Sequence, residues 1–182
     1  GARTSRSGQV VTLREVRKEV GNDAARFYYV MRKSEQHIDF DLDLAVSQSK
    51  DNAVYYIQYA HARVNRMIGK ASEKNVPFDI TQLHTYDVSL LTLEAESEIL
   101  AKLAAYPEIV IRAANNYEPH QVGNYLKELA SLFHAWYNLD DAKVLDEQNV
   151  TLSQARLLLS LNVQQVLKNG LTLLGVSAPD SM

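Results

Sequence analysis

Residues 52–70, "NAVYYIQYAHARVNRMIGK", carry four tyrosine or histidine rings and several basic side chains, but no carboxylate. Asn52 is a favourable N-cap, Gly69 is suited to end a helix, and nothing between them forbids one. The sequence therefore predicts a helix of about four turns.

Apolar and polar residues of this predicted helix fall on separate faces. Spacings of three and four place one stripe toward a core: Val54, Ile57, His61, Val64 and Ile68. A second, outward stripe lies roughly 160° away: Tyr56, Tyr59, Arg63, Arg66 and Lys70. Tyrosines that stack on unpaired bases and cations that meet phosphates would suit nucleic acid. The alternative, which this helix alone favours, is that the tyrosines pack on a neighbouring helix and the cations are solvated.

Composition indicates an ordinary globular protein. The 182 residues suffice for one well-cored domain, with or without a small appendage. The absence of cysteine excludes disulfides and thiolate metal sites and fits a reducing compartment. Apolar runs are too short for a membrane span, and "GARTSRSGQ" (1–9) lacks the apolar core of a signal peptide. We expect a cytoplasmic protein with no membrane contact.

Charges are sorted along the chain. The net charge of −3 argues mildly against nucleic acid. However, residues 52–72 and 148–179 contain cations and no acid, whereas 75–101 contain acids and no base. This sorting permits one positive surface on an acidic protein.

Capping and breaking residues outline the elements before the quoted helix. Thr12 and Glu15 have the spacing of a capping box, which predicts a short helix that Gly21 ends. Asn22 or Asp23 should cap the next helix. Residues 37–45, "HIDFDLDLA", alternate apolar and acidic side chains and predict an extended segment or an ordered connector.

The second half of the sequence predicts further helices. After a loop over about 73–88, a helix should stop before Pro107, and two more should follow at roughly 107–116 and 119–138. A last helix should break near Gly170. In the helix at 119–138, one stripe is apolar: Val122, Leu126, Leu129, Phe133 and Trp136. The opposite stripe is polar: His120, Asn124, Lys127, Ser131, His134 and Asn138. These patterns predict an all-α helical bundle.

Catalytic and metal-binding patterns are missing. The five histidines lack the spacing of a metal site, and neither a nucleophile elbow nor a phosphate-binding glycine loop is present. Asp39, Asp41 and Asp43 lack the glycine and glutamate of a calcium loop. We assign no catalytic residue and no metal ligand, and interpret the chain as a binding module.

Several long motifs resemble the C-terminal part of bacterial arginyl-tRNA synthetases. They are "SGQVVTLREVRKEVGNDAARFYYVMRKSEQHIDFDLDLAVSQSKDNAVYYIQYAHARV" (7–64), "EPHQVGNYLKELASLFHAWYN" (118–138) and "ARLLLSLNVQQVLKNGLTLLGVSAPDSM" (155–182). The resemblance implies that residues 1–50 are the end of the catalytic domain, with the remnant of its KMSKS-type loop and connector helices. Residues 51–182 would be the anticodon-binding bundle of the DALR type.

The resemblance also implies what this part of the enzyme can do. No HIGH motif occurs, and "ARTSRSG" (2–8) diverges from the KMSKS-type pattern, so the chain alone should not form aminoacyl-adenylate. ATP with Mg²⁺ would serve the full-length arginine–tRNA ligase and not this part of it. The expected partners are tRNA(Arg) and the catalytic domain in cis, in a monomeric enzyme.

The resemblance carries an RNA-binding role to particular positions. Tyr56, Tyr59 and Arg63 match positions that approach the anticodon stem and loop, and Arg66 extends their stripe. Met182 matches a contact at the carboxyl terminus, and Tyr137 and Phe133 match aromatic positions, although the apolar stripe explains Phe133 equally well. The hypothesis is tRNA(Arg) anticodon recognition; the alternative is a protein-interaction module with a Tyr/Arg docking face.

Overall fold

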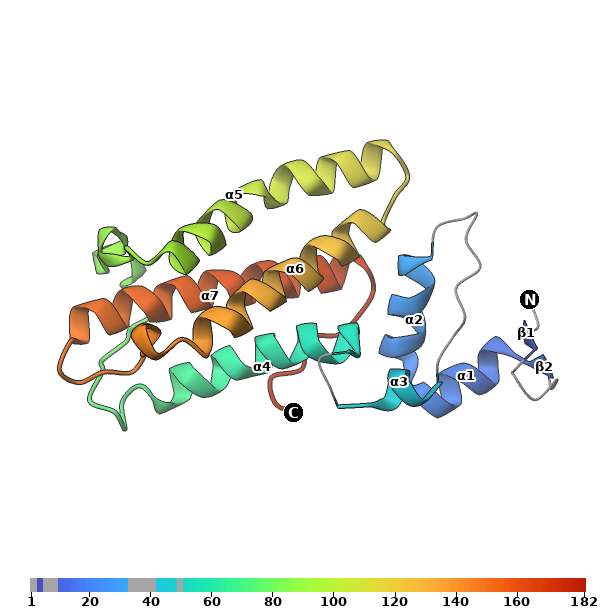
Figure 1. Cartoon of the computed structure of the whole chain (residues 1–182), viewed down its shortest axis with the longest axis horizontal. Coiled ribbons are helices and arrows are strands. Elements are labelled where there is room, and N and C mark those ends of the chain that lie inside the picture. The colour runs from blue at the N-terminus through green and yellow to red at the C-terminus, as the bar shows by residue number, and fades with distance from the viewer. Residues whose placement is uncertain (1–2, 5–9, 33–41, 49–50) are drawn as a thin grey trace.

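The computed structural model describes residues 3–4, 10–32, 42–48 and 51–182, and helices dominate these ranges. Four long helices form a bundle: α4 (Ala53–Lys70), α5 (Glu94–Asn115), α6 (His120–Tyr137) and α7 (Val150–Leu173). Three shorter helices lie at one end of the bundle (Figure 1): α1 (Leu13–Val20), α2 (Asn22–Met31) and α3 (Leu42–Val46). The predicted all-α bundle is confirmed.

Short elements complete the described structure. Two-residue strands β1 (Arg3–Thr4) and β2 (Val10–Val11) pair antiparallel, with Arg3 opposite Val11. Single 3₁₀ turns are η1 (Leu83–Thr85), η2 (Val88–Leu90) and η3 (Asp140–Ala142). The segment predicted as a loop at 73–88 therefore includes one helical turn.

The predicted core stripes of α4 and α6 do form the core. Val54, Ile57, His61 and Val64 of α4 are buried, and Ile68 is half-buried. All five apolar positions of the α6 stripe are buried, with Phe133 and Trp136 fully enclosed. These residues pack with apolar side chains of α7, so the two stripes fix how α4 and α6 face each other.

Capping residues define where α1 begins and ends and where α2 begins. The Thr12 backbone N–H donates to Glu15 Oε2 over 2.7 Å, so the predicted capping box is present, and Gly21 (φ 84°) ends α1 as predicted. The prediction that Asn22 or Asp23 caps α2 is wrong, because Gly21 is the N-cap and makes no side-chain bond. Instead, the Asp23 carboxylate accepts from Gln58 and from Ser177.

The predicted helix end at Pro107 is wrong. α5 runs through Pro107 as one helix, in place of the two predicted segments. Proline removes one helical hydrogen bond and crowds the preceding turn. Leu103, Tyr106 and Ile109, on both sides of Pro107, pack on the same core. This shared burial favours helix on both sides, and Pro107 itself is exposed.

Two glycines expected at helix ends lie inside helices. Gly69 precedes the last residue of α4. Gly170 lies in α7 where the Leu126 side chain of α6 approaches so closely that a Cβ would lie 2.5 Å from Leu126 Cδ2. Gly170 is thus a close-packing residue. The turn that follows α7 uses Gly175, whose φ of 72° suits glycine.

The alternating stretch at 37–45 is not extended where the structure describes it. Residues 42–46 form α3, in which Leu44 and Val46 are exposed, and residues 37–41 lie outside the described ranges. A period-two pattern predicts a strand only where another strand can pair with it, and the described neighbour of α3 is helix α1.

Candidate nucleic-acid interface

Side chains of α4 and α6 meet in a cluster of rings around one guanidinium. We call Tyr56, Tyr59 and Arg63 of α4 with His134 and Tyr137 of α6 the Tyr/Arg cluster. His134 lies 4.3 Å from the Tyr56 ring and 5.6 Å from the Tyr59 ring, between centroids. The Tyr59 ring also stacks on Tyr55 at 5.9 Å.

The predicted outward stripe of α4 is only partly outward. Arg66 and Lys70 are exposed as predicted, but Tyr56, Tyr59 and Arg63 are half-buried. The reason is α6, which lies against this side of α4 and places His134 among the rings. The structure therefore combines features of the two interpretations of the stripe. The tyrosines pack on a neighbouring helix, and each of them also remains partly exposed to solvent.

His134 is buried, with 4% of its surface exposed, and both ring nitrogens have partners. Nδ1 lies 2.9 Å from Arg63 Nη1, and Nε2 lies 3.1 Å from the Tyr56 carbonyl oxygen. Burial above all, with a smaller contribution from Arg63, lowers the pKa of His134 to about 4, against the Tyr56 carbonyl, which raises it. The imidazole is therefore neutral at pH 7.

Arg63 is held by two hydrogen bonds and two rings. Besides its contact with His134, it donates from Nη2 to the Tyr59 hydroxyl over 3.2 Å. Its guanidinium carbon lies 4.7 Å from the Tyr59 ring centroid and 4.2 Å from that of Tyr137. Hydrogen bonding from Arg63, and a weaker contribution from Arg66, lowers the pKa of the Tyr59 hydroxyl.

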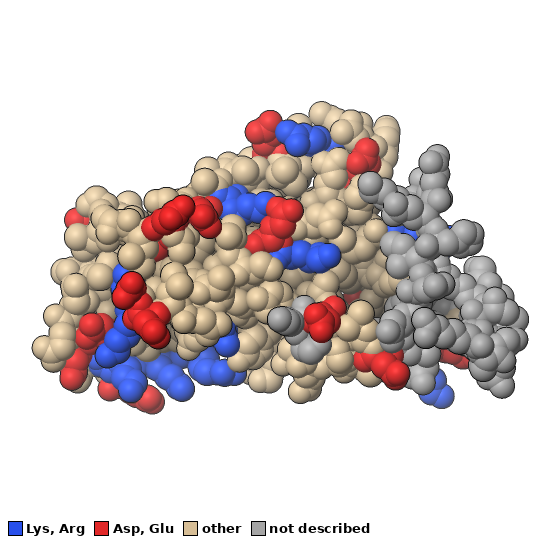
Figure 2. Space-filling view, in the orientation of Figure 1, with Lys and Arg blue, Asp and Glu red and all other residues tan. Residues whose placement is uncertain are grey.

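Basic side chains continue from the cluster along α4. Lys and Arg gather at the lower left edge of Figure 2, where the carboxyl-terminal half of α4 lies in Figure 1, with acidic side chains next to them. The cations of α4 in this half are Arg63, Arg66 and Lys70. Arg156, one of the two cations in the acid-free stretch 148–179, is buried against Glu96 and adds nothing to the surface.

Of the other predicted contact residues, Tyr137 and Met182 are exposed and Phe133 is buried. Tyr137 is 38% exposed and joins the cluster through Arg63. Phe133 is fully buried, so the structural interpretation holds for it. Met182 is 46% exposed.

The segment before Met182 runs along another side of α4. Gln58 donates to the Ser177 carbonyl, His61 Nδ1 lies 3.1 Å from the Pro179 carbonyl, and Asn65 donates to Asp180. These three α4 residues lie roughly 100° or more around the helix axis from Tyr59. The described contacts thus place the tail beside the cluster's helix and do not bring Met182 into the cluster.

A shallow pocket of about 310 Å³ adjoins Tyr56 at the start of α4. Asp51, Ala53 and Tyr56 line it from one side, and Lys127 and Ser131 of α6 line it from the other. Lys127 and Ser131 belong to the polar stripe of α6, and their sequence pattern alone indicates no role for them. Their spacing of four, followed by a spacing of three to His134, places all three side chains on one face of α6, and the structure shows that this face lies toward α4.

His134 is the cluster residue that sequence reasoning missed. Helical spacing assigns it to the polar stripe of residues 119–138, and its sequence neighbours indicate no partner for it. The signal was present, because a helix with an apolar stripe flanked by a histidine can bury that histidine against a third element. Nothing in the sequence identified α4 as that element.

Metal and membrane features can be stated for the described ranges. There, no group of three or more His, Cys, Asp or Glu side chains is arranged to hold a metal ion. No helix in the same ranges is long and apolar enough to cross a bilayer.

Comparisons with known proteins agree with one another. The chain is 73% identical over 179 residues to an arginine–tRNA ligase of Acinetobacter baylyi, covering 98% of this chain and 29% of the relative. The chain thus spans less than a third of the length of this relative. Another arginine–tRNA ligase, from Psychrobacter sp., is 59% identical and is covered to 30% of its length.

Solved structures give the same result. An arginyl-tRNA synthetase structure from Campylobacter jejuni superposes with a TM-score of 0.82 at 27% identity, over 98% of this chain and 37% of that one. An arginyl-tRNA synthetase from Thermus thermophilus gives a TM-score of 0.72 at 32% identity, over 91% of this chain and 27% of that one. Residues 57–182 match the sequence model of the DALR anticodon binding domain, so the chain belongs to that family.

Proposed function

We propose that this chain binds the anticodon stem and loop of tRNA(Arg) as the C-terminal part of an arginine–tRNA ligase. The observation that carries the proposal is the ordered Arg63 guanidinium at the half-open edge of the Tyr/Arg cluster, in a domain of the DALR family. Tyrosine rings and arginines are the side chains that bind unpaired nucleotides.

The proposed contacts are Tyr56, Tyr59, Arg63, Arg66, Tyr137 and Met182. Arg66 and Lys70 are exposed one and two turns beyond Arg63, which supports a path for the RNA backbone along α4. Tyr137 offers the most exposed ring of the cluster. Met182 would enter from the side of the tail, beside Asn65.

The rest of the enzyme belongs to the same proposal. Residues 1–50 would link the bundle to a catalytic domain in cis, and residues 51–182 would be the anticodon-binding bundle. ATP with Mg²⁺ would act in the catalytic domain of a monomeric, cytoplasmic ligase. The alternative, a protein-interaction module with a Tyr/Arg docking face, has no comparison in its favour.

Filter binding tests the proposal. The chain should retain tRNA(Arg) in preference to the same tRNA with a changed anticodon, and the affinity should fall steeply with salt because phosphate contacts release counterions. Equal retention of both RNAs, or RNA binding that is independent of salt, would contradict it.

Variants locate the interface. Base stacking on a ring contributes about 1–3 kcal/mol, so Tyr59→Ala should weaken binding roughly tenfold or more per folded molecule. Arg63→Ala should weaken binding and, if Arg63 meets a phosphate, lower the salt slope by about one unit. Arg112→Ala on α5 is the charge-matched control and should leave affinity unchanged, because Arg112 is exposed and pairs with Glu108.

Stability must be separated from binding. Ile57→Ala should cost about 2–5 kcal/mol of unfolding free energy, because Ile57 is fully buried, with no change in affinity per folded molecule. Tyr59→Ala should cost less, since Tyr59 is half-buried. If Tyr59→Ala destabilises as much as Ile57→Ala and leaves affinity intact, Tyr59 is a packing residue alone.

A further inference from the structure

The hydrogen bonds of His134 determine which tautomer it adopts. Arginine remains protonated and can only donate, so His134 Nδ1 must accept from Arg63 Nη1. The Tyr56 carbonyl can only accept, so Nε2 must carry the hydrogen and donate to it. Both partners therefore require the same neutral form, with the proton on Nε2 and a lone pair aimed at Arg63.

This arrangement fixes the Arg63 side chain before any ligand arrives. His134 accepts one N–H and the Tyr59 hydroxyl accepts another, so three of the five guanidinium hydrogens remain for a ligand. Rings of Tyr59 and Tyr137 lie against the guanidinium. A free arginine side chain loses considerable rotamer freedom on binding, whereas this one has already lost much of it.

We propose that His134 is a positioning residue for RNA binding: its Nδ1 lone pair holds Arg63 between Tyr59 and Tyr137, so that the guanidinium meets the RNA already ordered. The inference rests on the proposed function. Three N–H groups of Arg63 are accepted by neither His134 nor Tyr59, and they form the edge that is left for a ligand. The ligand is therefore an acceptor group in line with that edge, either a phosphate or a base edge carrying oxygen or nitrogen acceptors.

A double-mutant cycle tests whether His134 acts through Arg63. The variants are His134→Phe, which keeps a ring but removes the acceptor, Arg63→Ala, and the two combined, with tRNA(Arg) transcript as the probe. Ordering one side chain corresponds to roughly a three- to tenfold effect, and His134→Phe should weaken binding by this much. In the Arg63→Ala background it should have no further effect. Effects that simply multiply would overturn the inference.

Two further measurements can test the proposal if His134→Phe folds poorly. His134→Asn offers an amide oxygen near the position of Nδ1 and should recover most of the affinity; a loss equal to that of Arg63→Ala would contradict the proposal. Nitrogen NMR of the wild-type chain without RNA should show His134 protonated on Nε2 and bare on Nδ1. A proton on Nδ1 would overturn the proposal whether or not RNA binds.

The salt slope identifies the acceptor. Arg63→Ala lowers the slope by about one unit if the acceptor is a phosphate, and leaves it unchanged with altered base preference if the acceptor is a base. Either result supports an edge contact, whereas an unchanged slope with unchanged base preference overturns it. If the wild-type chain binds no tRNA(Arg), the proposed function fails; if it binds but the cycle is additive, the role of His134 alone fails.

Discussion

Burial sets the charge of His134, and this has a consequence for stability. The folded pKa is about 4, lowered chiefly by burial, whereas an unfolded histidine titrates near 6.5. Between these pH values the unfolded chain binds a proton that the folded chain does not. The contribution of His134 to stability is therefore present above pH 6.5 and is lost as the pH falls toward 4.

Acid should destabilise the wild-type chain more than a His134→Asn variant. Urea unfolding followed by circular dichroism at pH 7 and pH 4.5 should show an additional loss of about 2 kcal/mol in the wild type. His61, whose pKa burial also lowers, titrates in both proteins and cancels in the comparison. Equal losses in the two proteins would show that His134 is not kept neutral by the fold.

At this scale the sequence predicted which residues gather but not how they are held. Periodicity placed Tyr56, Tyr59 and Arg63 on one stripe of α4, and the resemblance added Tyr137. Their contacts with one another depend on His134 and on how α4 packs against α6. Periodicity within one helix does not predict that packing. A stripe that faces away from one core can still face a neighbouring helix, and helical period alone does not distinguish the two.

Helix α5 tests how proline is tolerated within an element. Pro107 should cost the helix about 3 kcal/mol relative to alanine in an exposed interior position. Pro107→Ala should therefore raise the unfolding free energy by about 1–3 kcal/mol, part of the gain being offset by the more flexible unfolded chain. Urea unfolding measures this change.

The opposite result has a clear meaning. If Pro107→Ala is neutral or destabilising, the helix ends at the proline as the sequence suggested. Ala104→Gly, in the preceding turn at another exposed position of α5, is a matched control and should lower stability by about 1 kcal/mol if helix continues there.

Local signals predicted the helix starts after Thr12 and Asn52, but not the N-cap of α2, and predicted helix interruptions poorly. The caps at Thr12 and Asn52 depend on side chains within a few residues, so sequence suffices. Whether Pro107 or Gly170 ends a helix depends on what lies across from it, which for Gly170 is Leu126. Packing overrode the local preference at both positions.

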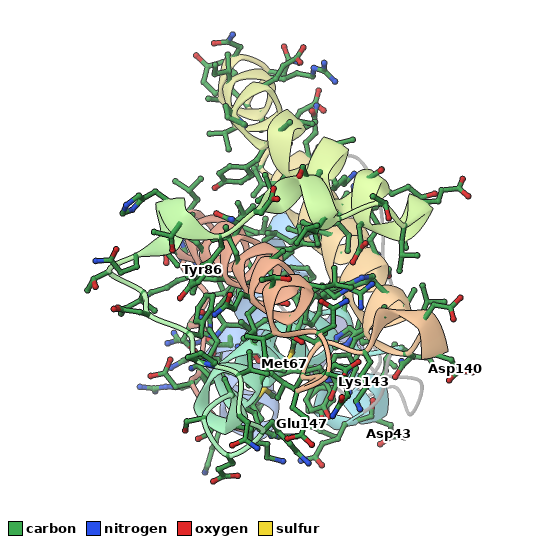
Figure 3. All side chains as sticks on the ribbon, turned by 90° about the vertical axis from the view of Figure 1, so that its left-hand side faces the viewer. Asp43, Met67, Tyr86, Asp140, Lys143 and Glu147 are labelled. Atoms are coloured by element: carbon green, nitrogen blue, oxygen red, sulfur yellow. The ribbon has the colours of Figure 1, made fainter. Side chains whose placement is uncertain are left out.

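A buried charge pair joins three of the four bundle helices, α5, α6 and α7. Arg156 of α7 donates from Nε to Glu96 Oε2 of α5 over 2.9 Å, and the Trp136 indole of α6 donates to the same oxygen over 3.2 Å. Arg156 also donates to the Lys143 carbonyl in the connection between α6 and α7. Figure 3 views the bundle from the end at which α7 begins, and its labels Lys143 and Glu147 mark the connection between α6 and α7.

Removing one partner should be costly. Glu96→Gln leaves the Arg156 charge buried without its counter-ion, so the unfolding free energy should fall by about 3–5 kcal/mol. Exposed Glu94→Gln, in the same first turn, should change it by less than about 0.5 kcal/mol. Glu96→Leu with Arg156→Met should recover much of the loss, and equal effects of Glu96→Gln and Glu94→Gln would show that the pair is not structural.

The junction of these three helices also gives the molecule an optical reporter. Trp136 is the sole tryptophan of the sequence, and its ring is fully enclosed. Excitation at the red edge of the absorption band, where the tyrosines hardly absorb, therefore selects a single indole beside a carboxylate. Its emission should be blue-shifted in the native protein and move to the red when α5 or α7 separates from α6, so loosening of the bundle becomes visible even while the helices themselves persist.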